Sequence, residues 1–229
     1  MRLDIVTLFP GMCTPLEESI LGRARSKGLV EVQAIDLRQF THDRHRTADD
    51  APCGGGAGMV MKAAPVAEAV NALRQPGTRV VMLTPQGKPF TQRDAERLAK
   101  ERHLILLCGH YEGMDERADL ALVDESISIG DYILTNGTLA ALVVADSVIR
   151  LIPGVLGAAE SVAEESFVAG NLLEYPQYTR PEEWEGMAVP AVLLSGNHKT
   201  IADWRRGMRF LRTLSRRPDL FERGMEKVP

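Results

Sequence analysis

Short apolar runs alternate with helical patterns over the first half of the chain. Four runs have the length and the Val, Ile and Leu content of buried strands: Leu3–Phe9, Leu29–Ala34, Arg79–Thr84 and Leu104–Cys108. Three intervening segments have helical spacing: Pro15–Lys27, Pro65–Arg74 and Gln92–Glu101. Strand–helix alternation of this kind predicts an α/β domain with a mainly parallel sheet.

The composition changes after Gly154. From Glu160 to Glu185 there are seven acidic residues, and the apolar residues lose their regular spacing. A loop of this length is uncommon in a compact protein unless it is functional or disordered. We therefore divide the chain into a domain over 1–158, a mobile linker over 159–181 and a second domain over 182–229.

The C-terminal segment is basic, with nine Lys and Arg between Lys199 and Lys227 against four Asp and Glu. On a helix, one side carries Ile201, Trp204, Met208, Leu211 and Leu214, and the other carries Arg205, Arg206, Arg209, Arg212 and Arg216. The net charge of the whole chain is −4, so nucleic acid would bind at a local patch such as this one. We expect a small all-helical domain that binds RNA through residues such as Arg205 and Arg209.

The sequence predicts a cytoplasmic protein without a membrane partner. Its three cysteines, Cys13, Cys53 and Cys108, have neither metal-ligand spacing nor the number for a disulfide framework. The longest apolar stretch, Leu139–Ala159, contains two charges and a proline and is too broken to span a bilayer. The charged N-terminus predicts a first strand and no signal peptide.

A polar cluster lies between residues 40 and 58. Phe40–Arg46 contains arginines and histidines, Asp49 follows, and Gly54–Gly58 is nearly all glycine. Backbone N–H groups approach a ligand closely where there is no Cβ, so the cluster suits phosphate and base contacts. A solvated, flexible surface loop is an equally good interpretation. Neither a P-loop nor a dinucleotide-binding glycine pattern is present.

Three glycine-bearing turns follow predicted strands or apolar runs: Leu83–Gly87, Leu107–Gly113 and Ser128–Leu134. In open α/β sheets, ligands bind beyond the carboxyl ends of the strands, so the three turns together predict one pocket. Each turn taken alone is more often an ordinary turn than part of a binding site.

Two further segments carry candidate catalytic residues. Arg150 ends a helix over Leu139–Ile149 that is apolar on nearly every side. This pattern predicts that the helix is buried all round, with another subunit as one candidate for its cover. Its position four residues after Asp146, near a helix C-terminus, gives it an equally good structural role. The linker contains Glu164 and Glu165, for which solvated charge is the simplest interpretation.

Taken in order, these segments resemble the tRNA (guanine-N1-)-methyltransferase family of the TrmD type, in the SPOUT superfamily. The resemblance covers almost the whole chain and rests on LFPGM (Leu8–Met12), FTHDRHRTADD (Phe40–Asp50), GGGAGMVM (Gly54–Met61), LTPQG (Leu83–Gly87), CGHYEGMDER (Cys108–Arg117), SIGDYIL (Ser128–Leu134), RLIPGVLG (Arg150–Gly157), YPQYTRP (Tyr175–Pro181) and VLLSGNH (Val192–His198). Each motif is weak alone, and the ordered set is specific.

The resemblance implies a trefoil-knotted N-terminal domain, a small helical C-terminal domain and a homodimer with the active site between subunits. It implies methyl transfer from S-adenosylmethionine to N1 of the guanine just 3′ of the anticodon, position 37 in tRNA; the family is also associated with Mg²⁺. The donor would contact Pro85, Gly109, Tyr111, Glu112, Ile129, Gly130, Asp131, Tyr132, Ile133 and Leu134.

The resemblance also implies roles for residues toward RNA. Arg150 would polarise the guanine O6, and Glu165 would remove the N1 proton. A general base is required because guanine N1 is protonated at neutral pH, and the negative charge then moves toward O6. The remaining expected RNA contacts are Asp49, Gly58, Arg44, Arg46 and Ser166.

The chain departs from the family pattern at three places. Glu165 replaces an aspartate, Asn136-Gly137-Thr138 replaces Gly-Gly-Glu, and Cys53 replaces a tyrosine. The alternatives are a SPOUT methyltransferase for another RNA position and an RNA-binding protein without catalysis.

Overall fold

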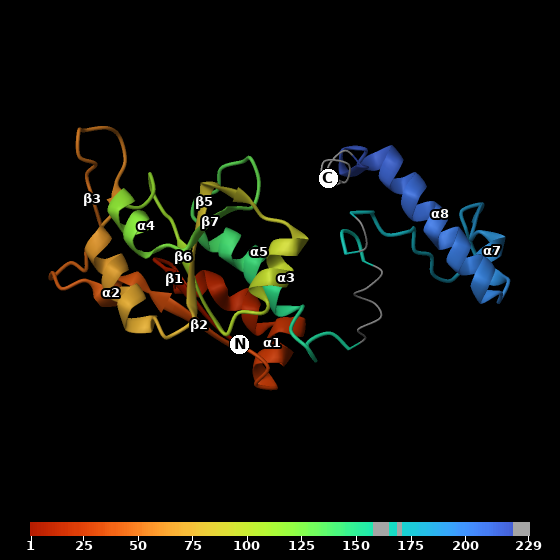
Figure 1. Cartoon of the computed structure of the whole chain (residues 1–229), viewed down its shortest axis with the longest axis horizontal. Coiled ribbons are helices and arrows are strands. Elements are labelled where there is room, and N and C mark those ends of the chain that lie inside the picture. Colours follow the sequence, from red (N-terminus) through yellow and green to blue (C-terminus); the bar gives the residue numbers. More distant parts are fainter. Residues whose placement is uncertain (158–164, 169–170, 222–229) are drawn as a thin grey trace. The chain divides into compact units, whose positions relative to one another are not determined.

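The computed structural model describes residues 1–157, 165–168 and 171–221 of the chain. It forms two compact units, Met1–Gly157 and Ala158–Pro229, and each is considered by itself (Figure 1). The divide falls beside the sequence-based boundary at residue 158. Glu160 and Glu164, two of the acidic residues of the expected linker, lie outside the described residues.

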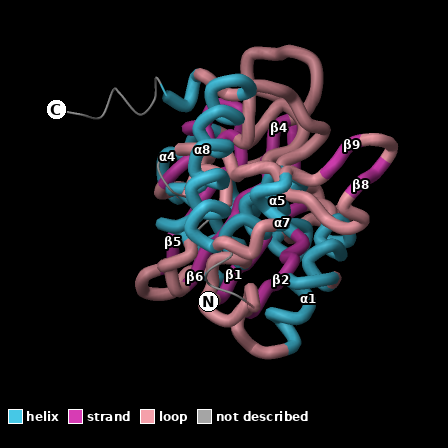
Figure 2. The backbone as a smooth tube through the Cα atoms, turned by 90° about the vertical axis from the view of Figure 1, so that its right-hand side faces the viewer, coloured by secondary structure: helices cyan, strands magenta, loops and turns pink. Residues whose placement is uncertain are grey.

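The first unit contains a five-stranded parallel sheet of order β2-β1-β6-β5-β7 (Figures 1 and 2). Its strands are β1 (Arg2–Thr7), β2 (Glu31–Asp36), β5 (Thr78–Pro89), β6 (His103–Cys108) and β7 (Glu125–Ser128). The predicted parallel α/β class is confirmed. The sequence analysis missed β7 because its four residues, Glu-Ser-Ile-Ser, do not form an apolar run.

Helices cover both faces of this sheet, which explains why its strands are so apolar. Every residue of the central strand β6 is buried. One face packs against η1 (Pro10–Glu17), α1 (Ser19–Ser26), α3 (Gln92–Leu98) and α5 (Thr138–Ile149). The other packs against η2 (Leu37–Phe40), α2 (Ala63–Leu73) and α4 (Glu116–Leu122). A two-stranded sheet of β3 (Asp49–Asp50) and β4 (Val60–Met61) completes the unit.

The single helix predicted over Pro15–Lys27 is wrong. The chain instead forms the 3-10 helix η1 and then α1, separated by Glu18 in an extended conformation. Pro15 lies inside η1 and has no N–H to donate, which disfavours one continuous α-helix through this segment.

Helix α5 is buried on most of its surface, but not on all of it. Its alanines and valines on one side pack into the core, whereas Leu139 and Val143 are 41% and 47% exposed. The expectation of complete burial therefore fails for a single copy of the chain. The two residues form an apolar strip with no cover among the described residues.

The second unit contains α7 (Ala191–Leu194), α8 (His198–Arg216) and a short hairpin of β8 (Glu183–Trp184) and β9 (Met187–Ala188) (Figure 2). The helical C-terminal region is confirmed, and the hairpin adds strands that the sequence analysis did not predict. Asn197 caps α8 by accepting from the N–H groups of Lys199 and Thr200. Across the described residues, no helix is both long and apolar enough to cross a membrane.

The covered side of α8 contains both apolar and basic residues, because Ile201, Trp204 and Met208 are half-buried and so is Arg205. Leu211 and Leu214 are 56% and 52% exposed, whereas Arg205 stacks on the ring of Tyr175 at 4.7 Å. The segment before the hairpin packs along this side, and the backbone N–H of Leu173 donates to Thr213 Oγ1. The helical period gives the angle of each side chain, but the packing of this segment decides which sector is buried.

Candidate functional site

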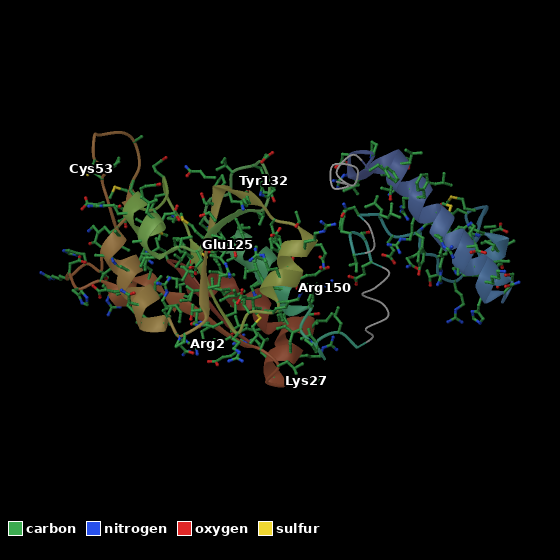
Figure 3. All side chains as sticks on the ribbon, viewed as in Figure 1. Arg2, Lys27, Cys53, Glu125, Tyr132 and Arg150 are labelled. Carbon is green, nitrogen blue, oxygen red and sulfur yellow. The ribbon has the colours of Figure 1, made fainter. Side chains whose placement is uncertain are left out.

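The first unit contains a cavity of about 540 Å³ at the carboxyl ends of β5, β6 and β7. The three predicted glycine-bearing turns line it together, through residues 84–86, 109–114, 128–130 and 132–137. This volume is within the range of small-molecule sites. Tyr132 lies on the third turn and is exposed at the rim (Figure 3).

All but one of the residues expected to hold the donor line this cavity. They are Pro85, Gly109, Tyr111, Glu112, Ile129, Gly130, Tyr132, Ile133 and Leu134. Asp131 is the exception and is not part of the lining.

Two glycines allow the turns to approach closely. The N–H of Gly137 donates to the carbonyl of Gly109 at 2.7 Å, and a β-carbon at Gly137 would lie 2.8 Å from Gly109 N. Gly130 has a φ of +147°, and a β-carbon there would collide with the Tyr132 ring. The sequence Asn136-Gly137-Thr138 departs from the family pattern, but it keeps a glycine where the backbones touch.

The cavity is acidic. Its lining contains the carboxylates of Glu112, Glu116 and Asp119, and no Lys or Arg. Carboxylates suit a ligand that carries a positive charge and hydroxyl groups. The lining therefore fits a cationic, nucleoside-sized molecule.

The residues that follow the glycine-rich loop are hydrogen-bonded to the wall of this cavity. Glu112 N donates to Met59 O at 3.0 Å, and Met61 N donates to Gly113 O at 2.9 Å. The carboxylate of Glu112 occupies the space where Gly58 has no side chain. The segment expected to contact RNA thus packs on the segment expected to contact the donor.

The polar segment before this loop forms a defined turn. Asp43 accepts hydrogen bonds from the backbone and the hydroxyl of Thr47 at 2.8 and 2.7 Å, and these bonds lower its pKa. The side chains of Arg44 and Arg46 are exposed, and Asp49 pairs with Met61 in the small sheet. Cys53 lies on the exposed loop beyond β3 (Figure 3).

The sequence analysis did not single out His110 and Phe9. The His110 ring lies 5.0 Å from the Phe9 ring and 4.2 Å from the Tyr111 ring, at the cavity. Burial and, next, the nearby charge of Arg38 lower the pKa of His110 below its ordinary value, which favours the neutral imidazole. Its Nδ1 is buried and has no hydrogen-bond partner in the described part of the chain. Both residues lie inside motifs that carry the family resemblance, LFPGM and CGHYEGMDER, so the sequence contained a signal by which they could have been found.

The two expected catalytic residues belong to different units. Arg150 caps the C-terminal end of α5, where its N–H donates to Asp146 O at 3.1 Å (Figure 3). Glu165 begins a turn of the second unit, in which Ser166 Oγ accepts from Glu174 N at 2.9 Å. No group of three or more His, Cys, Asp or Glu that could hold a metal ion is found among the residues described.

The family model and the known proteins that match this chain carry the same description. The family model described as "tRNA (Guanine-1)-methyltransferase TrmD" matches residues 1–223. A tRNA (guanine-N(1)-)-methyltransferase of Geobacillus kaustophilus is 56% identical over 225 residues, 97% of this chain and 92% of the relative. The proteins of the same name from Chloroflexus aggregans and Dictyoglomus turgidum are 58% and 53% identical over 97% of this chain, and cover 88% and 91% of their own lengths.

Proposed function

Because the chain belongs to the TrmD family of tRNA (guanine-N1)-methyltransferases, we propose that it methylates the guanine immediately 3′ of the anticodon, position 37 in tRNA. Methyl transfer to guanine N1 of tRNA follows from membership of the family. The position in tRNA, the donor contacts, the catalytic residues, the cytoplasmic location and the dimer are our proposals.

The acidic cavity of the first unit supports S-adenosylmethionine as the methyl donor. Glu112 and its neighbours provide carboxylates for the ribose hydroxyls and the positive charges, and Ile129, Ile133 and Leu134 provide an apolar wall. When bound, the donor supplies an electrophilic methyl group. Gly109 lines this cavity, and a β-carbon there would meet only Leu83 O at an ordinary contact distance of 3.6 Å, so the chain itself leaves room for a side chain at this position.

The reaction requires a base and a group that stabilises charge. We assign removal of the guanine N1 proton to the carboxylate of Glu165, and stabilisation of the negative charge on O6 to the guanidinium of Arg150. We assign reading of the neighbouring RNA to Asp49, Gly58, Arg44, Arg46 and Ser166. The described residues hold no cluster that fits Mg²⁺, so no step is assigned to the ion.

The exposed apolar strip on α5 supports a homodimer. Leu139 and Val143 are the exposed apolar residues of an otherwise buried helix. A symmetric contact between two copies of the chain would bury this strip on both copies. The knotted chain path and a mobile linker remain predictions from the family.

Methylation of an unmodified tRNA transcript, followed by mapping of the methylated nucleotide, tests the function. We expect one methyl group on N1 of guanine 37 and none when that guanine is replaced. A methyl group elsewhere would support the alternative of another RNA position. Binding of tRNA without methylation would support the non-catalytic alternative.

Calorimetry on the protein without RNA tests the donor cavity. We expect S-adenosylmethionine to bind, and Gly109→Val to abolish the binding heat because the added side chain fills the cavity. Unchanged binding by a folded Gly109→Val protein would contradict the proposed donor position.

A further inference from the structure

A buried hydrogen bond between two threonines lies behind the wall of the donor cavity. Thr138 is the first residue of α5 and directly follows the residues of the third glycine-bearing turn that line the cavity. Its hydroxyl oxygen lies 2.7 Å from that of Thr7, the last residue of β1, and both side chains are buried. Thr7 Oγ1 also accepts from the N–H of Phe9 at 3.1 Å. Neither threonine lines the cavity, so the pair supports the wall without being placed to touch the donor.

Asn136 provides a second attachment of the same turn. Its Oδ1 accepts from Thr138 N at 2.9 Å, as the side chain of a helix cap does, and its Nδ2 donates to the sulfur of Met12 at 3.6 Å. Asn136 and Thr138 replace a glycine and a glutamate of the family pattern. The family glycine has no side chain for either contact of Asn136, and the family glutamate has no hydroxyl. These attachments therefore come from the positions at which this chain departs from its family.

The two attachments lie on either side of Gly137. The N–H of Gly137 donates to Gly109 O at 2.7 Å, and a β-carbon at Gly137 would be only 2.8 Å from Gly109 N. Both glycines line the cavity, Gly109 on the second turn and Gly137 after the third. The distance between these two walls of the cavity is therefore fixed by residues that flank Gly137.

The same contacts give a role to the LFPGM segment, Leu8–Met12, to which the proposed function assigns none. Thr7 precedes this segment and Met12 ends it, so the segment is held at both ends to the residues around Gly137. In its middle, the Phe9 ring lies 5.0 Å from the ring of His110 on the second turn. None of the five residues lines the cavity. The segment supports the second and third turns from behind.

We propose that the Thr7–Thr138 hydrogen bond, together with the cap from Asn136, positions the third turn against the second and so sets the affinity for the methyl donor. The proposal rests on the proposed function in taking this cavity as the donor site. The physical reason is preorganisation: a turn that is already held in its bound position loses less conformational entropy when the ligand binds. Thr7 and Thr138 are positioning residues, because they act through Gly137 and not on the donor.

Calorimetry with S-adenosylmethionine on the full chain, without RNA, tests the proposal. Thr138→Val keeps the shape of the side chain and removes its hydroxyl, which leaves the buried Thr7 hydroxyl without this partner. We expect Thr138→Val to bind the donor about tenfold more weakly. Thr138→Ser keeps the hydroxyl and should restore most of the affinity.

Thr78→Val is the matched control. The Thr78 hydroxyl forms a hydrogen bond of 2.7 Å with His103 Nδ1, at the amino ends of β5 and β6 and thus at the opposite edge of the same sheet. This variant should lose stability, as Thr138→Val does, but keep its donor affinity. Equal losses of donor affinity in Thr78→Val and Thr138→Val would overturn the proposal, because the loss would then follow general stability. Normal donor affinity in Thr138→Val would also overturn it.

Thr7→Val removes the same hydrogen bond from its other side and replaces Thr138→Val if that variant fails to fold. The double variant Thr7→Val/Thr138→Val should bind the donor about as well as either single variant, because one shared bond is lost in all three. Fully additive losses would mean that the two hydroxyls act separately, which contradicts the proposal.

Hydrogen exchange of the Gly137 amide, measured without ligand, distinguishes failure of this proposal from failure of the proposed function. We expect Thr138→Val to speed this exchange about tenfold or more, and to speed it more than Thr78→Val does, because the Gly137–Gly109 bond opens locally. Unchanged exchange would overturn the positioning role. If the unaltered protein binds no S-adenosylmethionine, the proposed donor site fails, whereas the exchange rates still decide whether the threonine pair holds the turn.

Discussion

The carboxylate of Glu112 fills the space beside Gly58, where any side chain at position 58 would collide with it. Glu112 lines the proposed donor cavity, and Gly58 belongs to the loop proposed to contact RNA. The two sites of the first unit therefore share a wall, and a change on the RNA side of this wall displaces a residue on the donor side.

Gly58→Ala should weaken S-adenosylmethionine binding by about tenfold, because the new methyl group displaces a carboxylate that accepts charged hydrogen bonds. Gly55→Ala is the matched control: both glycines have a φ of +82°, but a β-carbon at Gly55 meets nothing within 4 Å. Calorimetry measures both affinities. Equal affinities in the two variants would mean that the Glu112 position does not matter to the donor.

Arg150→Ala should lower single-turnover methylation by roughly 10²–10³, the usual cost of removing a donor to a developing negative charge. Its position at the end of α5 predicts only a small loss of thermal stability. The same experiment distinguishes the structural role suggested by the Asp146 spacing. In that case the variant would melt early, and its activity would fall only with the folded fraction.

Glu165→Gln should slow methylation by about 10²–10⁴ under single-turnover conditions, because it keeps the size of the side chain and removes its basicity. Donor and tRNA affinities should stay near normal. Glu165→Asp should retain far more activity, since it keeps a carboxylate. Glu164→Gln is the neighbouring control and should be nearly silent. A normal rate for Glu165→Gln would place the base elsewhere.

The protein should sediment as a dimer at low micromolar concentration, because the Leu139 and Val143 strip would otherwise remain in water. Val143→Glu places a charge on this strip and should shift the equilibrium toward the 25.2 kDa monomer. A fully active monomer would contradict an active site shared between subunits.

The cap of α3 predicts a pH-dependent contribution to stability. Asp94 accepts from the backbone and hydroxyl of Thr91 at 3.0 and 2.6 Å. Burial opposes ionisation of Asp94, but the hydrogen bonds from Thr91 and Arg97 outweigh it, so the pKa falls below its ordinary value of 3.8. Asp94→Asn should cost about 0.5–1 kcal/mol at pH 7.

This cost should shrink as the pH is lowered. The folded-state pKa is depressed, so the stabilisation is fully present above about pH 4 and is lost as the pH falls through the folded-state value. Urea unfolding of both proteins between pH 7 and about pH 2.5 measures the difference. A difference that grows on acidification would contradict the assigned direction.

The sequence was sufficient for the features that depend on local spacing. Apolar runs located β1, β2, β5 and β6, because a strand buried on both faces needs continuous apolar residues. The turns at Leu83–Gly87, Leu107–Gly113 and Ser128–Leu134 could be placed at one pocket, because parallel strands bring their carboxyl ends to the same edge. Their order along the chain also identified the family.

Tertiary packing decided what the spacing left open. The covered sector of α8 includes Arg205 instead of Leu211, because the segment around Tyr175 packs there, and nothing in the helical period specifies that partner. The contact of Gly58 with Glu112 joins residues more than fifty positions apart, and the half-buried ring of His110 contacts Phe9, which lies near the start of the chain. Such contacts follow from which surfaces meet in space, and that choice is made by the whole fold and not by any local pattern.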